Sequence, residues 1–491
     1  MSPPGRPKGE YRSAQREGTP VCPPGRPKGE YRSAQREGTP VRLFAIDALT
    51  PDGWKRDVAI EIAADGTIGT VTAGAQGNGA ERAAGPLLPG MPNLHSHAFQ
   101  RAIAGRTGRA GADGDSFWTW RQAMYAFLER IDPDAFEAIA AQAYVEMLKA
   151  GYTAVAEFHY VHHDPQGEPY ADPAELARRI VAAASETGIG LTLLPVLYAH
   201  AGFGGTPPAA GQRRFVHTLD SYARLVATLA RDAATTEWNL GVAPHSLRAV
   251  TPDELAAVVA LAVRDAPIHI HAAEQMQEVT ACLAWSGARP IEWLLDHAGL
   301  DARWCVVHAT HMTPDETSRL AASAAIAGLA PTTEADLGDG TFAARAYLDA
   351  GGAFGIGSDS NTILDPFAEL RQLEWSQRLA RQARNVLATT EVPVGQALYA
   401  AAARGGARAQ ARPAGAIAPG CRADFVVLDT ADAALAAQPV DVMLDAAIFG
   451  PCRRPVRDVM VGGRWLVREG RHPREEAIFE RYRACLAHLP S

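Results

Sequence analysis

Eight short apolar segments with β-like composition alternate with Ala-, Leu- and Arg-rich helical stretches through the middle of the chain. The candidate strands are 87–94, 154–158, 191–197, 240–243, 268–271, 305–307, 325–329 and 353–357, and the helical stretches between them include 133–150, 173–187, 252–264 and 313–323. Strands that are apolar almost throughout suit a parallel sheet buried on both faces. The alternation therefore predicts an α/β fold, a (β/α)8 TIM-like barrel of ordinary size.

Both ends of the ordered chain have a different, more β-like pattern. Short β-like runs occur at 43–46 and 58–62 and again at 424–429 and 459–467. Because the termini of a domain often lie close together, the two ends are expected to form one small β-sandwich around the barrel. The expected divisions are a leader at 1–41, the first part of the sandwich at 42–88, the barrel at 89–412, and the second part with a C-terminal helix at 413–491.

The first 41 residues contain a duplication. Residues 3–21 are repeated letter for letter at 23–41, and the segment is rich in Pro, Gly and charge. Such a composition does not support a packed core, so we expect a disordered leader. The two copies carry a net charge of +4, which leaves −12 for the rest of a chain whose total is −8. A basic docking arm is the alternative interpretation.

Composition excludes several classes of function. The chain is 47% hydrophobic and 21% charged, as in ordinary soluble proteins, and its acidic balance argues against a nucleic-acid partner. An apolar run long enough to span a membrane is missing, so no membrane partner is expected. Six scattered cysteines without a CxxC pair favour reduced thiols and a cytoplasmic location.

Polar residues follow several of the predicted strands. His95 and His97 come at the end of the first strand, His271 at the end of the fifth and Asp359 after the eighth. Residues i and i+2 of a strand share a face, and the carboxyl ends of barrel strands meet at one rim. Three imidazoles, one carboxylate and a position left for water are typical of a hydrolytic zinc site. Any single histidine could still be a structural one.

Other polar residues at the same rim could take part in chemistry. Glu274, three residues after His271, could shuttle a proton between water and substrate, or could be a solvated loop carboxylate. In the segment His-Ala-Thr-His, either His308 or His311 could lie at the site. His269 precedes His271 on the same strand and could be a ligand or a barrel-interior histidine.

Two arginines suggest the charge of the substrate. Arg121 lies in the segment SFWTWR and Arg248 in the segment APHSLRAV. A guanidinium near a metal centre normally pairs with an anion and binds carboxylates through paired hydrogen bonds. The pair therefore suits a dicarboxylate or amino-acid substrate, although either arginine could form a structural ion pair.

Taken together, the motifs resemble the amidohydrolase superfamily. The resemblance rests on the first His-X-His, the strand-five His-Ala-Ala-Glu, the strand-six His and the strand-eight Asp. Five segments resemble the formimidoylglutamate deiminase family in particular: PGMPNLHSHAFQRAIAGRTG (89–108), SFWTWR (116–121), APHSLRAV (243–250), HIHAAEQ (269–275) and GSDSN (357–361). The likeness runs from about Arg42 to the C-terminus and leaves out the duplicated leader. Ala272 stands where a bulkier aliphatic residue is expected, a change that affects no chemical group.

The resemblance implies a set of roles. It implies one Zn²⁺ per subunit on His95, His97, His271 and Asp359, with Glu274, His308 and Asp359 catalytic. It places the substrate on Gln100, Arg121, Tyr160, His245 and Arg248. The implied reaction is hydrolysis of N-formimino-L-glutamate to N-formyl-L-glutamate and ammonia in histidine degradation, by a homodimer.

Two other functions remain open at this point. A related deaminase or chlorohydrolase could act on a purine, pterin or triazine ring, but such a neutral ring would favour aromatic and amide contacts over two arginines. A non-catalytic metal-binding scaffold is the second alternative. Glu274 argues against it, because a structural zinc site does not require that carboxylate.

Overall fold

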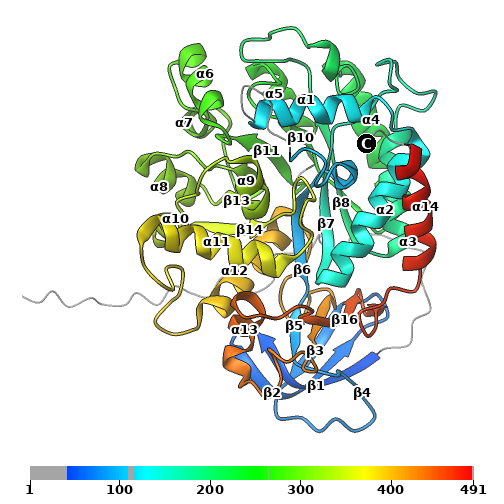
Figure 1. Ribbon diagram of the computed structural model, residues 1–491, viewed down its shortest axis with the longest axis vertical. Coiled ribbons are helices and arrows are strands. Elements are labelled where there is room, and N and C mark those ends of the chain that lie inside the picture. The colour runs from blue at the N-terminus through cyan, green and yellow to red at the C-terminus, as the bar shows by residue number, and fades with distance from the viewer. Residues whose placement is uncertain (1–40, 109–115, 264, 489–491) are drawn as a thin grey trace, which may run out of the picture.

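A computed structural model describes residues 41–108, 116–263 and 265–488 of the chain. Figure 1 shows a larger region of parallel strands enclosed by helices, with a smaller β region beneath it. The first strand and the last strands of the chain both lie in the smaller region. The predicted disordered leader falls almost entirely outside the described residues.

The smaller region is one mixed sheet built from both ends of the chain. Its strands are β1 (Val41–Thr50), β2 (Gly53–Ile62), β3 (Ile68–Thr72), β4 (Glu81–Arg82), β5 (Leu87–Pro89), β15 (Phe425–Leu428), β16 (Val456–Val461) and β17 (Arg464–Val467). They are ordered β17-β16-β15-β5-β1-β2-β3, with β4 paired to β1. Buried side chains such as Leu43, Ile60 and Phe425 form its core. The predicted union of both chain ends is confirmed, but the strands form a single sheet instead of two facing sheets.

The larger region contains the predicted parallel strands. They are β6 (Met91–Ser96), β7 (Tyr152–His159), β8 (Gly190–Leu197), β9 (Asn239–Leu240), β10 (Ala243–Pro244), β11 (Ile268–Ala272), β12 (Trp304–His308), β13 (Ile326–Leu329) and β14 (Ala353–Ile356). One sheet is ordered β10-β8-β7-β6, with β9 beside β8, and the other is ordered β11-β12-β13-β14. Isolated parallel bridges join the two sheets at Ser246–His271 and at Ser96–Asp359. Continuous pairing does not close the ring, so the α/β arrangement is confirmed and the closed barrel is not.

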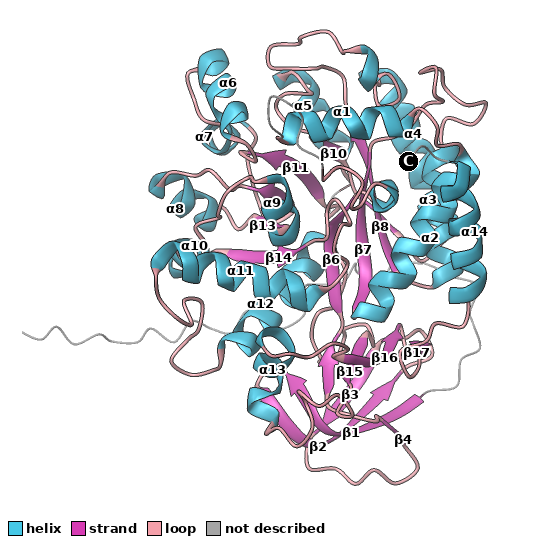
Figure 2. Cartoon of the chain, viewed as in Figure 1, coloured by secondary structure: helices cyan, strands magenta, loops and turns pink. Residues whose placement is uncertain are grey.

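Helices cover the outside of the parallel strands (Figure 2). They are α1 (Phe117–Leu128), α2 (Pro133–Ala150), α3 (Glu175–Thr187), α4 (Leu219–Ala233), α5 (Pro252–Leu261), α6 (Met276–Ser286), α7 (Pro290–His297), α8 (Pro314–Ala322), α9 (Pro331–Leu337), α10 (Ala344–Asp349), α11 (Pro366–Arg381), α12 (Val394–Ala409), α13 (Met443–Phe449) and α14 (Glu475–His488), with short 3-10 turns at Ala98–Ala102, Ala210–Gln212 and Val440–Val442. Helix α2 has the same bounds as the helical stretch predicted at 133–150, because local signals mark both of its ends. Asp132 accepts a hydrogen bond from the Ala135 amide, Pro133 opens the first turn, and Gly151 ends the helix with φ of 108°.

One predicted strand proves to be two. The apolar run at 87–94 divides at Gly90 into β5, which joins the terminal sheet, and β6, which joins the parallel strands. A Cβ atom at Gly90 would lie 2.3 Å from Thr153 Oγ1, so the crossing point accepts no larger residue without rearrangement. This junction connects β6 directly to the terminal sheet.

Two further sequence expectations concern thiols and membranes. Within the described ranges, Cys282, Cys305, Cys452 and Cys485 take part in no disulfide. Among the described residues, the helices are too short or too polar to cross a bilayer.

Candidate metal centre and active site

Four side chains from three strand ends converge at the upper rim of the parallel strands. His95 and His97 come from the end of β6, His271 from β11, and Asp359 from the loop after β14. We call these four residues the metal cluster. His95 Nε2 lies 3.2 Å from His97 Nε2 and 3.0 Å from His271 Nε2, and Asp359 Oδ1 lies 3.2 Å from His97 Nε2. All four are buried, and one ligand atom from each falls within 4.8 Å of the others.

Two histidines of the metal cluster are oriented by backbone carbonyls. His97 Nδ1 lies 3.0 Å from the carbonyl oxygen of Phe158, and His271 Nδ1 lies 3.1 Å from that of His245. Since a carbonyl can only accept, each Nδ1 carries a proton, and each Nε2 faces the other residues of the metal cluster. Burial lowers the pKa of His95 to about 3 and that of His271 well below its usual value. Converging lone pairs beside a carboxylate repel one another unless a cation lies between them, so these residues fit a divalent metal ion.

The Asp359 loop is fixed by a buried network that sequence reasoning missed. Ser358 N donates to Asn93 Oδ1 at 3.1 Å, and Asn361 Nδ2 donates to the His97 carbonyl at 2.8 Å. Asp359 and Asn361 have φ values of 43° and 56°, a left-handed conformation that needs such support. Both asparagines stood inside the motifs PGMPNLHSH and GSDSN, yet nothing in those letters showed that they bond across the rim.

Glu274 and His308 lie beside the metal cluster. Glu274 Oε1 is 3.6 Å from His308 Nε2, which is 3.7 Å from Asp359 Oδ2. Burial raises the pKa of Glu274. Burial alone would lower the pKa of His308, but the charges of Glu274, Asp359 and Glu334 raise it well above its usual value. Glu334 Oε1 lies 3.4 Å from His308 Nδ1, a contact that the sequence did not predict. The arrangement can hold a proton next to a metal ion.

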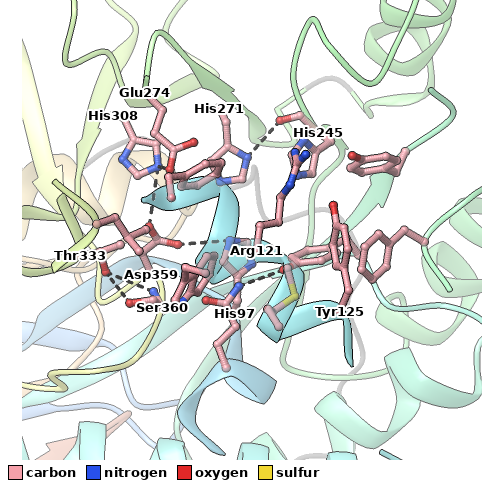
Figure 3. A pocket seen from close by; sticks show the side chains of 18 of the residues that line it. His97, Arg121, Tyr125, His245, His271, Glu274, His308, Thr333, Asp359 and Ser360 are labelled. Atoms are coloured by element: carbon pink, nitrogen blue, oxygen red, sulfur yellow. Dashed lines mark hydrogen bonds and ion pairs between the residues drawn. The ribbon is translucent and has the colours of Figure 1, made fainter. Parts of the chain in front are cut away.

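The predicted substrate residues line one pocket with these groups (Figure 3). Arg121 enters from α1 and Arg248 from the loop after β10, and Gln100 Nε2 donates to Tyr160 Oη at 2.9 Å. The buried Nε atoms of both arginines have no hydrogen-bond partner. Arg248 reaches Glu274 only at 3.9 Å. The Nε donors of both guanidinium groups are therefore available to an anionic ligand.

Further residues of the pocket wall were not foreseen as a set. They are Phe117, Trp120, Met124, Tyr125, Tyr198, Phe215, Thr333, Leu337 and Ser360. Figure 3 shows Tyr125 across the pocket from His308 and Glu274. The segment SFWTWR contributes Phe117, Trp120 and Arg121 to this wall.

Two histidine assignments that the sequence left open are resolved by position. His269 Nε2 lies 2.7 Å from the carbonyl oxygen of Ala409 at the end of α12, so this side chain faces away from the metal cluster. His308 lines the pocket, whereas His311 does not. His269 is therefore the barrel-interior histidine of the two interpretations.

Comparisons with known proteins agree with this geometry. The amidohydrolase family matches residues 87–466, and the N-terminal domain of formimidoylglutamate deiminase HutF matches residues 42–85. A formimidoylglutamate deiminase of Pseudomonas aeruginosa is 54% identical over 435 residues, which cover 88% of this chain and 96% of that protein.

Two solved structures share the fold. An amidohydrolase from Brucella melitensis superposes with a TM-score of 0.87 at 50% identity and covers 91% of this chain and 99% of its own. An adenosine deaminase from Xanthomonas campestris, solved with bound zinc, has a TM-score of 0.76 at 23% identity, over 91% of this chain and 98% of its own. The chain therefore belongs to the amidohydrolase family. Within that family it groups with the formimidoylglutamate deiminases.

Proposed function

We propose that this chain is a zinc-dependent hydrolase that converts N-formimino-L-glutamate and water into N-formyl-L-glutamate and ammonia, a step of histidine degradation. The observation that carries the proposal is the presence, in one pocket, of the metal cluster, the Glu274–His308 pair and two arginines without anionic partners at Nε. The P. aeruginosa relative supports the same substrate.

The metal cluster would hold a single zinc ion, to which three imidazoles and one carboxylate are suited. A zinc bound there supplies Lewis acidity and lowers the pKa of water at the site to about 7. The adenosine deaminase of the same fold was solved with bound zinc, which favours this metal over others. One zinc per subunit is the stoichiometry that we propose.

The protein side chains would carry the protons of the reaction. As the water oxygen bonds to the formimino carbon, Asp359 accepts the proton that the water loses. Glu274, whose pKa is raised by burial, delivers a proton to the imino nitrogen. His308 donates a hydrogen bond to the new oxygen substituent on the tetrahedral carbon. Asp359 then passes the proton it took from water to the amino nitrogen as the bond between that nitrogen and the tetrahedral carbon breaks. Ammonia leaves, the hydroxyl proton returns to Glu274, and a formyl C=O remains.

The other pocket residues would hold the glutamate part. Arg121 and Arg248 pair with its two carboxylates, because a guanidinium offers a carboxylate two parallel hydrogen bonds. Gln100, Tyr160 and His245 complete the contacts. The aromatic wall around Tyr125 encloses the aliphatic part of the substrate.

An assay of ammonia release tests the proposal. The zinc-loaded protein is offered formimino-L-glutamate, formimino-L-aspartate, an aminopurine and an aminotriazine, and ammonia is measured with a coupled enzyme. We expect turnover of the formimino-amino acids alone. Release from a ring substrate without release from formiminoglutamate would assign the chain to the ring deaminases, and zinc content without any turnover would favour a scaffold.

Several finer assignments belong to the same proposal. The two parallel sheets would form one closed (β/α)8 barrel, which is supported by the isolated bridges at both of their junctions. The domain limits that we propose are 42–88, 89–412 and 413–491, and the change from mixed to parallel pairing supports them. A homodimer rests on family resemblance, and a cytoplasmic location rests on the cysteine pattern.

A further inference from the structure

A second group of possible metal ligands adjoins the metal cluster. It consists of Glu274 after β11, His308 at the end of β12, and Asp339 in the loop after α9. One ligand atom from each lies within 4.8 Å of the others, and all three residues are buried. Asp339 has no part in the chemistry proposed above.

Asp339 is buried with one oxygen that lacks a partner. Its side chain is 4% exposed, and Gln275 Nε2 donates a hydrogen bond to Oδ1 while Oδ2 receives none. An unpaired carboxylate oxygen inside a protein costs free energy, and a bound cation removes that cost. The group therefore contains a free ligand atom as well as a suitable set of residue types.

The surrounding charge also favours a cation. Glu274, Asp359 and Glu334 approach His308 at 3.6, 3.7 and 3.4 Å. Arg248 forms an ion pair with Glu274, but only at 3.9 Å. One imidazole nitrogen with carboxylate oxygens is a donor set that zinc accepts.

We propose that Glu274, His308 and Asp339 form a second divalent-cation site, which zinc fills when it is in excess and which inhibits the enzyme. Asp359 stands between the two sites, because Oδ1 faces the imidazoles of the metal cluster and Oδ2 faces His308. Pairs of metal ions about 3.5–4 Å apart occur in several classes of hydrolase. Glu274 and His308 line the pocket, so the cation enters from the side of the substrate.

Inhibition is expected because the cation would bind two groups that the reaction uses. This expectation rests on the proposed function. A cation on the Glu274 carboxylate and the His308 ring nitrogen takes the two groups that handle the reaction proton and the new oxygen substituent. Excess zinc is therefore expected to lower kcat, and substrate is expected to oppose its binding because both use the same pocket.

The test measures metal content and uses activity as a second readout. Protein with one zinc per chain, verified by emission spectroscopy, is dialysed against rising free zinc. We expect the wild-type protein to gain a second zinc and to lose activity over the same range. Asp339→Asn should bind that second zinc at least about tenfold more weakly, as is usual when one supporting ligand is lost. Asp336→Asn, which changes an exposed acid near the end of α9, is the matched control and should behave as wild type.

The outcomes are separable from those of the proposed function. Because metal content is read directly, the second site is decided even if no ammonia is released from formiminoglutamate. If Asp339→Asn fails to fold, the isosteric Glu274→Gln is read by zinc content alone and should stop at one equivalent. Wild-type protein that remains at one zinc, or Asp339→Asn that takes up the second zinc like Asp336→Asn, would overturn the second site. A rise in activity with the second equivalent would overturn the inhibition.

Discussion

The two halves of the pocket are built in different ways. The metal-binding half comes from strand ends, and its ligands are oriented by backbone carbonyls and by the buried bonds of Asn93 and Asn361. The arginine half comes from α1 and the loop after β10, and the Nε atoms of Arg121 and Arg248 have no partner. The side chains of the metal-binding half are already fixed by hydrogen bonds within the protein. The arginine half instead has Nε donors that lack acceptors.

This difference indicates a division of labour. A rigid half fixes the position where water is activated, since preorganised ligands lose little entropy at the moment of reaction. The Nε atoms of Arg121 and Arg248 supply substrate affinity, because an anion satisfies donors that would otherwise stay desolvated and without an acceptor. Damage to the first half should therefore affect catalysis and metal binding, and damage to the second should mainly affect discrimination between substrates.

The largest effect is expected from a change in the metal cluster. His271→Ala removes one of four ligands, so zinc content should fall below one per chain. The rate constant kcat should drop by about a thousandfold or more, since metal activation is worth several kcal/mol. The measurements are emission spectroscopy for zinc and ammonia release for activity.

The control for this change is His488→Ala, an exposed histidine in the last turn of α14. It should leave both zinc content and kcat unaltered. Circular dichroism would show whether each variant folds. A folded His271→Ala protein with full zinc and full activity would remove His271 from the metal cluster.

A smaller and more selective effect is expected in the arginine half. Arg121→Ala and Arg248→Ala should each lower kcat/KM for formiminoglutamate by about 10- to 100-fold, the value of one charge-assisted hydrogen bond. With N-formimino-L-glutamine, which lacks the side-chain carboxylate, one of the two substitutions should lose most of its effect. Zinc content should stay at the wild-type value in both.

Arg130→Ala changes an exposed arginine just after α1 and serves as the reference for these variants. If each arginine variant lowers kcat/KM equally for formiminoglutamate and for N-formimino-L-glutamine, neither arginine binds the side-chain carboxylate. Substrate recognition would then lie with Gln100, Tyr160 and His245.

Much of the fold could be predicted because it depends on local patterns. The helix predicted at 133–150 matches α2 (Pro133–Ala150), where a capping Asp132, Pro133 and Gly151 mark both ends. The strand predicted at 191–197 starts one residue late against β8 (Gly190–Leu197). The division of 87–94 at Gly90 was missed, because it depends on contact with Thr153 on another strand.

The candidate site shows the same limit. His95, His97, His271 and Asp359 were predictable, since strand periodicity and barrel topology send their side chains to one rim. Asp339 and Glu334 were not, because they approach His308 from α9 and the loop after it, whose path depends on tertiary packing. The sequence predicts which strand ends meet, but it does not predict which loop residues fold back onto them.

The smallest effect is expected from Asn361, which contacts the metal-binding half without being one of its ligands. Asn361→Ala removes the hydrogen bonds to the His97 carbonyl and to Ser96 Oγ while leaving every ligand of the metal cluster in place. Loss of such outer support typically weakens metal binding by about 10- to 100-fold, so activity should fall at limiting zinc and largely return at moderate added zinc. Zinc affinity is measured by competition with a chelator, with the exposed Asn78→Ala as reference. If Asn361→Ala binds zinc as tightly as Asn78→Ala, the metal-binding half does not depend on this network. The difference in rigidity between the two halves of the pocket would then depend only on the strands that carry the metal ligands.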